Sequence, residues 1–303
     1  MSEFVNVLDG PFLREWEERQ ASPVEATPTP LASWNRMCGD DGGRVGIARG
    51  WFVTLGGNPG YGKSVIALNM AYFALVARES VGFISLEMSP EQLAARFYAI
   101  ATGTNIRELE RGDGFSREGF GTVREKLQRI QLDAGLADFF VNRDPLHHVT
   151  DVLAHMEALR KATVKWFVVD YMQLVGTGDD ENIYKQTTEV ATALRLFAHK
   201  NQVTVLGLSQ FNRRTSADYS QSPRAQALHG GMSLEANSDQ VALLDHSRYE
   251  QDGLEPHLAR TWLIIDKNRH GPRGSIPIEW NYKTLSIREA REDEEDQWPG
   301  AKR

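Results

Sequence analysis

The segment Gly57–Ser64, Gly-Asn-Pro-Gly-Tyr-Gly-Lys-Ser, matches the pattern G-x-x-x-x-G-K-[ST] at every fixed position. In this pattern the glycines let consecutive backbone N–H groups turn inward around an anion, so the segment predicts a phosphate-binding loop. The flanks agree: Trp51–Leu55 is a short apolar run typical of a buried strand, and Val65–Ala77 has the pattern of a helix. The alternative is a chance match on an ordinary strand–turn–helix. The phosphate loop predicts an α/β fold with a nucleotide at the start of the helix.

Two side chains of this loop have expected roles of their own. Lys63 is expected to contact the β- and γ-phosphates, and Ser64 to place its hydroxyl on Mg²⁺. ATP and Mg²⁺ are therefore the predicted cofactors. The predicted nucleotide-binding residues are Gly57, Asn58, Pro59, Gly60, Tyr61, Gly62, Lys63 and Ser64.

Composition limits the class of protein. The 303 residues are 41% hydrophobic and 25% charged, which is ordinary for a globular chain of one large or two small domains. We see no apolar stretch of membrane-spanning length and no signal-peptide pattern. Cys38 is the only cysteine, which fits a reducing cytosol and predicts a cytoplasmic protein without a membrane partner. The net charge of −7 argues against a monomer wrapped by nucleic acid, but allows a locally basic lining.

Three regions follow from the pattern along the chain. Residues 1–30 predict an arm whose proline-rich part, 21–30, is an extended linker. A short helix over 11–20 would carry Phe12, Leu13 and Trp16 on one side; it is either a frayed helix or an arm that docks on another surface. Residues 31–288 predict the ATPase domain, and 289–303 an acidic, disordered tail.

Four apolar runs each end in a polar group. The run 51–55 leads into the phosphate loop, 81–86 ends at Glu87, 164–169 at Asp170, and 203–208 at Ser209 and Gln210. Alternating strands and helices predict a mostly parallel central sheet covered by helices on both faces. Ligands bind at the carboxyl ends of such strands. We therefore expect Asp170 to hold Mg²⁺, Glu87 to act as general base for water, and Gln210 to sense the γ-phosphate.

Five segments together resemble the DnaB-type replicative helicases, in order and at similar spacing. The resemblance covers roughly residues 31–288 and implies a RecA-like P-loop ATPase domain. It also implies a ring, usually hexameric, that holds ATP between subunits and moves 5′ to 3′ on single-stranded DNA. The segments are Gly57–Ser64, 85–93, 170–174, 208–213 and 267–272.

The chain also departs from that family. It leaves no room for the family's N-terminal domain, which contacts primase. His229, Gly230 and Gly231 stand where the family often carries Arg-Glu-Ser, which puts the strength or mode of DNA binding in question. Glycines could still offer backbone N–H groups to phosphates.

The loop 211–228 is long and polar and predicts a DNA contact. It carries Arg213, Arg214 and Arg224 against a single acid, Asp218. Around a ring, several subunits would multiply this modest charge. The alternative is a surface loop without a ligand.

Lys267 and Arg269 end the apparent strand 261–266, which a turn and the return strand 275–280 follow. Residues two apart on a strand point the same way, so we expect both cations to reach one place. We predict that they complete the active site of the neighbouring subunit; the alternative is a salt-bridged surface hairpin.

Two functions remain open at this point. The first is an ATP-dependent DNA helicase motor, with single-stranded DNA, other copies of the chain, and a primase or loader as partners. The alternative is a non-unwinding, DNA-binding RecA-like ATPase, such as a recombination mediator or a helicase-loading factor.

Overall fold

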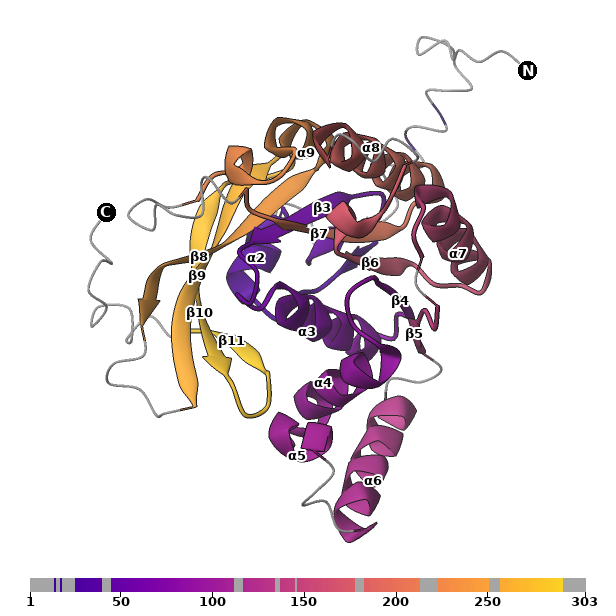
Figure 1. Cartoon of the computed structure of the whole chain (residues 1–303), viewed down its shortest axis with the longest axis vertical. Helices are drawn as coiled ribbons and strands as arrows, with labels where there is room; N and C mark the ends of the chain where they lie inside the picture. The colour runs from indigo at the N-terminus through magenta and orange to yellow at the C-terminus, as the bar shows by residue number, and fades with distance from the viewer. Residues whose placement is uncertain are drawn as a thin grey trace.

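The computed structural model describes residues 25–39, 45–111, 117–133, 137–144, 146–177, 183–212, 223–250 and 257–290, with the single positions Arg14 and Glu17. Within these residues, a nine-stranded sheet in the order β11-β10-β9-β8-β3-β7-β6-β4-β5 runs through the molecule (Figure 1). The order shows that strands distant in sequence become neighbours, so the crossovers place helices over the sheet.

Six neighbouring strands of this sheet are parallel, which confirms the predicted mostly parallel sheet. β3 lies between β7 and β8 and is buried at every position, because helices cover both faces there. The four apolar runs in the sequence did not predict β5 or β8. The parallel strands are β3 (Phe52–Gly57), β4 (Val81–Ser85), β5 (Phe139–Val141), β6 (Trp166–Asp170), β7 (Thr204–Gln210) and β8 (Gln240–Glu250).

An antiparallel edge continues the sheet beyond β8. β9 (Leu258–Asn268) pairs with β8 and with β10 (Gly274–Asn281), and β11 (Ile287–Glu289) pairs with β10. The predicted hairpin of 261–266 and 275–280 is confirmed, with longer strands than expected. Tyr282, which follows β10, lines the same cavity as the phosphate loop.

Helices cover both faces of the sheet, as predicted (Figure 1). One hydrophobic core lies under α2, α3 and α4, and a second lies under α7, α8 and α9. The helical elements are α2 (Ala32–Met37), α3 (Lys63–Val76), α4 (Pro90–Thr102), α5 (Ile106–Arg111), α6 (Arg117–Asp133), α7 (Val149–Lys161), η1 (Met172–Leu174), α8 (Ile183–Asn201), η2 (Ala225–Ala227) and α9 (Gly231–Asn237).

The last residues of the segment that we assigned to the arm belong to the folded body. β1 (Ala26–Thr27) pairs with β2 (Ile47–Ala48), and Thr27 is buried. A Cβ on Gly46 would lie 2.0 Å from the carbonyl oxygen of Thr27, so only glycine fits there. These contacts attach residues 26–27 to the ATPase domain. The first two residues of the predicted tail 289–303 also belong to the body, since Glu289 ends β11 and Ala290 is buried. Phe12, Leu13, Trp16 and residues 291–303 lie outside the described residues, and their expected roles stay predictions.

Candidate nucleotide-binding site

The phosphate loop connects β3 to α3 with the backbone that its glycines allow. Gly60 and Gly62 have φ angles of 76° and 85°, in the left-handed region that favours glycine. A Cβ on Gly62 would lie 2.4 Å from the indole ring of Trp280, so this aromatic side chain packs directly against the loop. The loop therefore has the local geometry of an anion cradle, with Trp280 as one wall.

Lys63 is held inside the loop by the loop itself. Its Nζ donates hydrogen bonds to the carbonyl oxygens of Gly57, at 3.0 Å, and Asn58, at 2.9 Å. Burial lowers the pKa of Lys63 to about 8, although the charges of Asp170 and Glu87 raise it. A buried cation whose hydrogen-bond partners are neutral carbonyls gains from an anion, because the phosphates of a nucleotide would supply the negative charge that compensates its burial.

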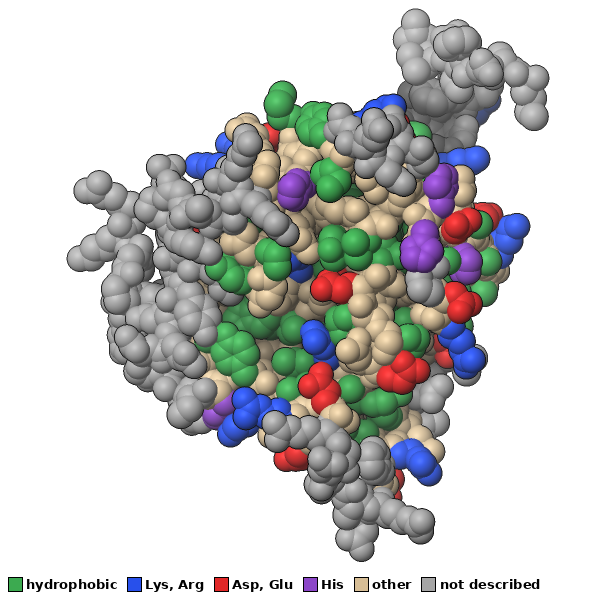
Figure 2. All heavy atoms as spheres, in the orientation of Figure 1, with side chains coloured by type: hydrophobic (Ala, Val, Ile, Leu, Met, Phe, Trp, Pro, Cys, Tyr) green, Lys and Arg blue, Asp and Glu red, His purple; other side chains and the backbone are tan. Residues whose placement is uncertain are grey.

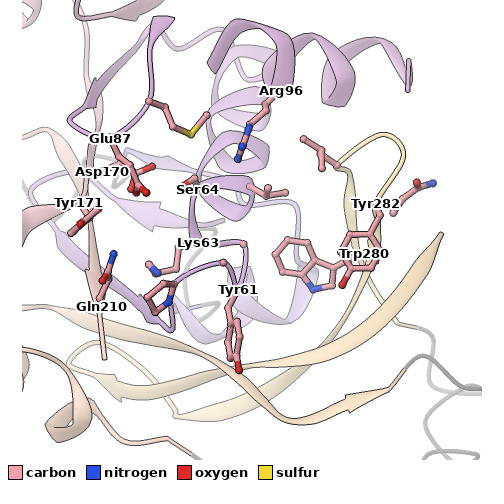
Figure 3. Close-up of a pocket in the computed structure, with 17 residues that line it drawn as sticks. Tyr61, Lys63, Ser64, Glu87, Arg96, Asp170, Tyr171, Gln210, Trp280 and Tyr282 are labelled. Carbon is pink, nitrogen blue, oxygen red and sulfur yellow. The ribbon is translucent and has the colours of Figure 1, made fainter. Parts of the chain in front are cut away.

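Asp170 and Ser64 meet at the carboxyl end of β6. Asp170 is buried and accepts a hydrogen bond from the side chain of Ser64. The pKa of Asp170 is raised to about 6, chiefly by burial and also by the charge of Glu87, against the lowering effects of Ser64 and Lys63. Figure 3 shows Glu87 and Asp170 side by side above Lys63. A hydroxyl beside a carboxylate is an oxygen donor set that fits Mg²⁺.

Glu87 stands where β4 passes into α4. The N–H of Leu86 donates to the carbonyl oxygen of Asp170 at 2.8 Å, which ties the ends of β4 and β6 together. Ser89 then begins α4 with a capping box, since its side chain accepts from the N–H of Gln92. Glu87 itself is exposed, so water reaches its carboxylate while the backbone on both sides is fixed.

Gln210, the last residue of β7, faces the same cavity. Its side chain is hydrogen bonded to Tyr171, the residue after Asp170. Burial, with the nearby charge of Glu87, raises the pKa of Tyr171, so its hydroxyl stays protonated and able to donate. Two residues after Tyr171, the side chain of Gln173 donates to the hydroxyl of Ser209 at 2.7 Å. The ends of β6 and β7 are therefore joined by two side-chain contacts.

These groups line one cavity of ≈390 Å³. The structure brings together the predicted Lys63, Ser64, Glu87, Asp170 and Gln210. Eight further lining residues were not predicted, which are Val65, Met88, Arg96, Tyr171, Trp280, Asn281, Tyr282 and Leu285.

Their origins explain why they were missed. Arg96 comes from α4, close enough for its charge to act on Asp170. It lies three residues beyond the segment 85–93, and no pattern in the sequence marked it as part of the site. Trp280 and Tyr282 lie across the phosphate loop from Gln210 (Figure 3), on the far antiparallel edge of the sheet. Tyr171, by contrast, could have been found, because it follows a strand-end acid directly.

Lys267 and Arg269 lie away from this cavity and share one partner, the C-terminal end of α9. Lys267 donates to the carbonyl oxygen of Glu235, and Arg269 donates to that of Ala236 and pairs with Asp239 at 3.6 Å. Cations at the last carbonyls of a helix are favourable. The two side chains therefore reach one place, as their spacing predicted.

The position of this pair excludes a role at the subunit's own phosphate loop. The N–H of Arg269 donates to the carbonyl of Asp239, whose N–H donates to the carbonyl of Phe52, the first residue of β3. The loop begins at Gly57, at the other end of β3, about 16 Å away. That is farther than the Arg269 side chain reaches, while Lys267, level with Thr54, donates to the carbonyl oxygen of Glu235.

The predicted DNA-contacting residues divide into three groups. Arg213 and Arg214 lie outside the described residues. Arg224 is exposed but pairs with Asp266, an acid from β9 that the sequence around the loop does not contain. The N–H groups of His229 and Gly231 donate to the carbonyls of Gln210 and Leu228, at 3.1 Å and 2.9 Å. Those two N–H groups are therefore already used within the chain, while the expected DNA contact of the segment stays a prediction.

The distribution of charged side chains on the surface agrees with the acidic net charge of −7. On the face in Figure 2, described Lys and Arg side chains are interspersed with Asp, Glu and hydrophobic side chains, and they form no continuous basic surface there. Among the helices that the structure describes, none combines the length and apolar character that a membrane crossing needs.

Fold and site together define a RecA-like P-loop ATPase. A solved ATPase domain superposes with a TM-score of 0.78 at 18% identity, covering 95% of this chain and 100% of that one. A DnaB-like replicative helicase, whose structure was described with its interactions with primase, superposes with a TM-score of 0.76 at 18% identity, over 94% of this chain and 68% of that one. Both likenesses concern the fold.

Sequence comparison identifies the family. The model of the DnaB-like helicase C-terminal domain matches residues 41–289, so the chain belongs to this family. A probable plasmid replicative DNA helicase of Chlamydia psittaci is 29% identical over 238 residues, 78% of this chain and 50% of the relative. The replicative DNA helicase DnaB of Geobacillus stearothermophilus is 28% identical over 285 residues, 92% of this chain and 60% of the relative. The chain thus spans about half to three fifths of the length of these relatives.

Proposed function

We propose that this chain is the ATP- and Mg²⁺-dependent motor of a ring-forming DNA helicase that translocates on single-stranded DNA. The observation that carries the proposal is the cavity that gathers a phosphate loop, a buried acid, an exposed acid and a strand-end glutamine in a member of the DnaB-like family. The resemblance adds a 5′ to 3′ direction, a hexameric ring, and a primase or loader as a further partner. A cytoplasmic setting, predicted from the single cysteine, belongs to the same proposal.

Five residues of the cavity have proposed roles in hydrolysis of the nucleotide. Lys63 binds the β- and γ-phosphates, and Ser64 and Asp170 hold Mg²⁺, which would neutralise charge on the phosphate oxygens. Glu87 orients a water and accepts its proton, since its carboxylate is exposed to the cavity on a fixed backbone. Gln210 contacts the γ-phosphate. Because its side chain is hydrogen bonded to Tyr171, a shift of Gln210 on that contact would also move the end of β6.

The active site is proposed to be completed by a neighbouring copy. Lys267 and Arg269 lie towards the amino ends of the parallel strands, and Arg269 is too far from its own phosphate loop. In a ring they would leave the α9 carbonyls and meet the γ-phosphate of the next subunit, a role worth about 10³–10⁵ in rate in other phosphoryl-transfer enzymes.

Mixed rings test this assignment. Rings assembled from Arg269→Ala alone should bind ATP but barely hydrolyse it. Rings assembled from Lys63→Ala alone should lose ATP hydrolysis. Mixed in one ring, the two variants form some interfaces with an intact Lys63 and an intact Arg269, so mixing should restore part of the activity. Mixtures that contain both chains by native mass spectrometry and stay inactive would show that Arg269 does not act in trans.

The alternative of a DNA-binding ATPase that does not unwind is tested on a forked duplex. The segment His229–Gly231 motivates it, because its occupied N–H groups leave fewer contacts for a phosphate. Strand displacement that requires ATP and a 5′ single-stranded tail supports the helicase motor. DNA-stimulated hydrolysis without strand displacement supports the alternative.

A further inference from the structure

Asp266, a residue of β9, binds the segment that closes the predicted DNA loop. Its Oδ1 accepts a hydrogen bond from Nη1 of Arg224 at 2.9 Å, and its Oδ2 accepts one from the N–H of Ala225 at 2.8 Å. The side chain of Asp266 is 8% exposed, whereas that of Arg224 is 71% exposed. The carboxylate is therefore a fixed, nearly buried anion, while most of the guanidinium still faces solvent.

This contact lies at the root of the loop rather than at its tip. Ala225 is buried and begins η2, whose last residue, Ala227, accepts a hydrogen bond from the N–H of Asn212 at 2.8 Å. Phe211 and Leu228 form an isolated antiparallel bridge beside it. The two ends of the loop are thus joined directly after Gln210, and Arg224 emerges at this junction.

The turn cannot shift without a shift of its neighbours. A Cβ on Gly231 would lie 2.5 Å from the carbonyl oxygen of Ala225, so η2 packs backbone to backbone against the start of α9. The bond from Ala225 to Asp266 holds this packed turn on β9. Arg224 can consequently exchange its partner by side-chain rotation alone, while the backbone that carries it stays in place.

We infer that the Arg224–Asp266 ion pair is exchanged when single-stranded DNA binds: a phosphate of the strand takes the guanidinium from Asp266. This inference rests on the proposed function. Guanidinium binds phosphate and carboxylate with the same forked geometry, so the two anions compete for one group. In the free subunit Asp266 neutralises the charge of Arg224 and lowers the affinity for DNA. Asp266 is thus a residue that sets the DNA concentration at which the motor is stimulated.

Asp266→Asn tests the inference because the amide can still accept the N–H of Ala225 but carries no charge. Breaking an ion pair of this exposure should raise the affinity for a fluorescein-labelled oligothymidylate, measured by anisotropy with ATP, about two- to fivefold. The slope of the logarithm of the binding constant against the logarithm of the salt concentration should steepen by up to about 0.7. This is the amount expected for one further phosphate contact on a single strand. The DNA concentration for half-maximal stimulation of hydrolysis should fall, with the maximal rate unchanged.

Two further variants isolate the pair. Arg224→Ala combined with Asp266→Asn should abolish the gain, since the freed cation is its source. Glu189→Gln on α8 removes the same unit of negative charge from an exposed position and should leave the affinity unchanged.

The outcomes separate this inference from the proposed function. If Asp266→Asn melts like the wild type and binds no more tightly, or if its gain survives in the double variant, the exchange is refuted and the helicase proposal stands. A wild-type chain that binds no single-stranded DNA with ATP present would refute both.

Discussion

Replacement of Asp170 by asparagine should make the nucleotide-free protein more stable at neutral and alkaline pH. Burial raises the pKa of Asp170 from its usual 3.8 to about 6. A group whose folded-state pKa is raised contributes stability below pH 3.8 and loses it as the pH rises through about 6. Above about pH 6, the ionised and buried carboxylate of Asp170 lowers the free energy of unfolding.

The size of this cost follows from the shift. At about 1.4 kcal/mol per pKa unit, the change from 3.8 to about 6 corresponds to at most about 3 kcal/mol. Asparagine keeps an oxygen for the hydrogen bond from Ser64, and the net shift already includes the attraction to Lys63, which lowers the pKa of Asp170. We therefore expect about 1–3 kcal/mol of added stability, or a Tm higher by a few degrees in a domain of this size.

Thermal unfolding at two pH values measures the effect. At pH 8 the variant should melt above the wild type, and at pH 5 the difference should fall to roughly half, because most of the native carboxylate is then protonated while that of the unfolded chain is still ionised. The variant should also lose the stabilisation that Mg²⁺ and ATP give the wild type. Asp138→Asn, at an exposed acid before β5, should shift Tm little at either pH. A variant that is less stable at pH 8, or a difference that is independent of pH, would refute the reasoning.

Two further predictions concern the catalytic base and the arm. Glu87→Gln should bind ATP normally and lose about 10²–10⁴-fold in turnover, because only proton acceptance is removed; wild-type turnover would exclude Glu87 as the base. Removal of residues 1–24 should lower the oligomeric mass in light scattering without lowering Tm. Removal of residues 1–30 should also cost about 1–3 kcal/mol of stability, because it deletes β1 and the hydrogen bonds of Thr29. Equal Tm values for the two truncations would contradict the assignment of β1 to the fold.

Local signals explain which parts of the site could be predicted. The phosphate loop is determined by residues a few positions apart, and its pattern was recognised. Glu87, Asp170 and Gln210 were found because parallel strands deliver their last residues to one edge, whatever the strand order. No such rule exists for Trp280, whose place against Gly62 depends on the pairing of the antiparallel edge.

The same limit applies to the acid that faces Arg224. Counting charges within the loop gave one acid for three arginines, but Asp266 comes from a strand more than forty residues later in the chain. Likewise, β8 escaped notice although it lies beside the phosphate-loop strand. Pairings between distant segments, rather than local pattern, therefore decide which charges are free to meet a ligand.

The sheet also explains why one subunit is not a complete motor in the proposed mechanism. The phosphate loop lies at the carboxyl ends of the parallel strands, while Lys267 and Arg269 lie at the amino ends, held by the last carbonyls of α9. A head-to-tail contact that brings one end to the other supplies the missing cations, and its repetition gives every subunit one such site. The exchange of these cations from helix carbonyls to a neighbour's phosphates would then link hydrolysis to the position of α9. Because α9 packs on the turn that carries Arg224, the same movement would reach the predicted DNA contact.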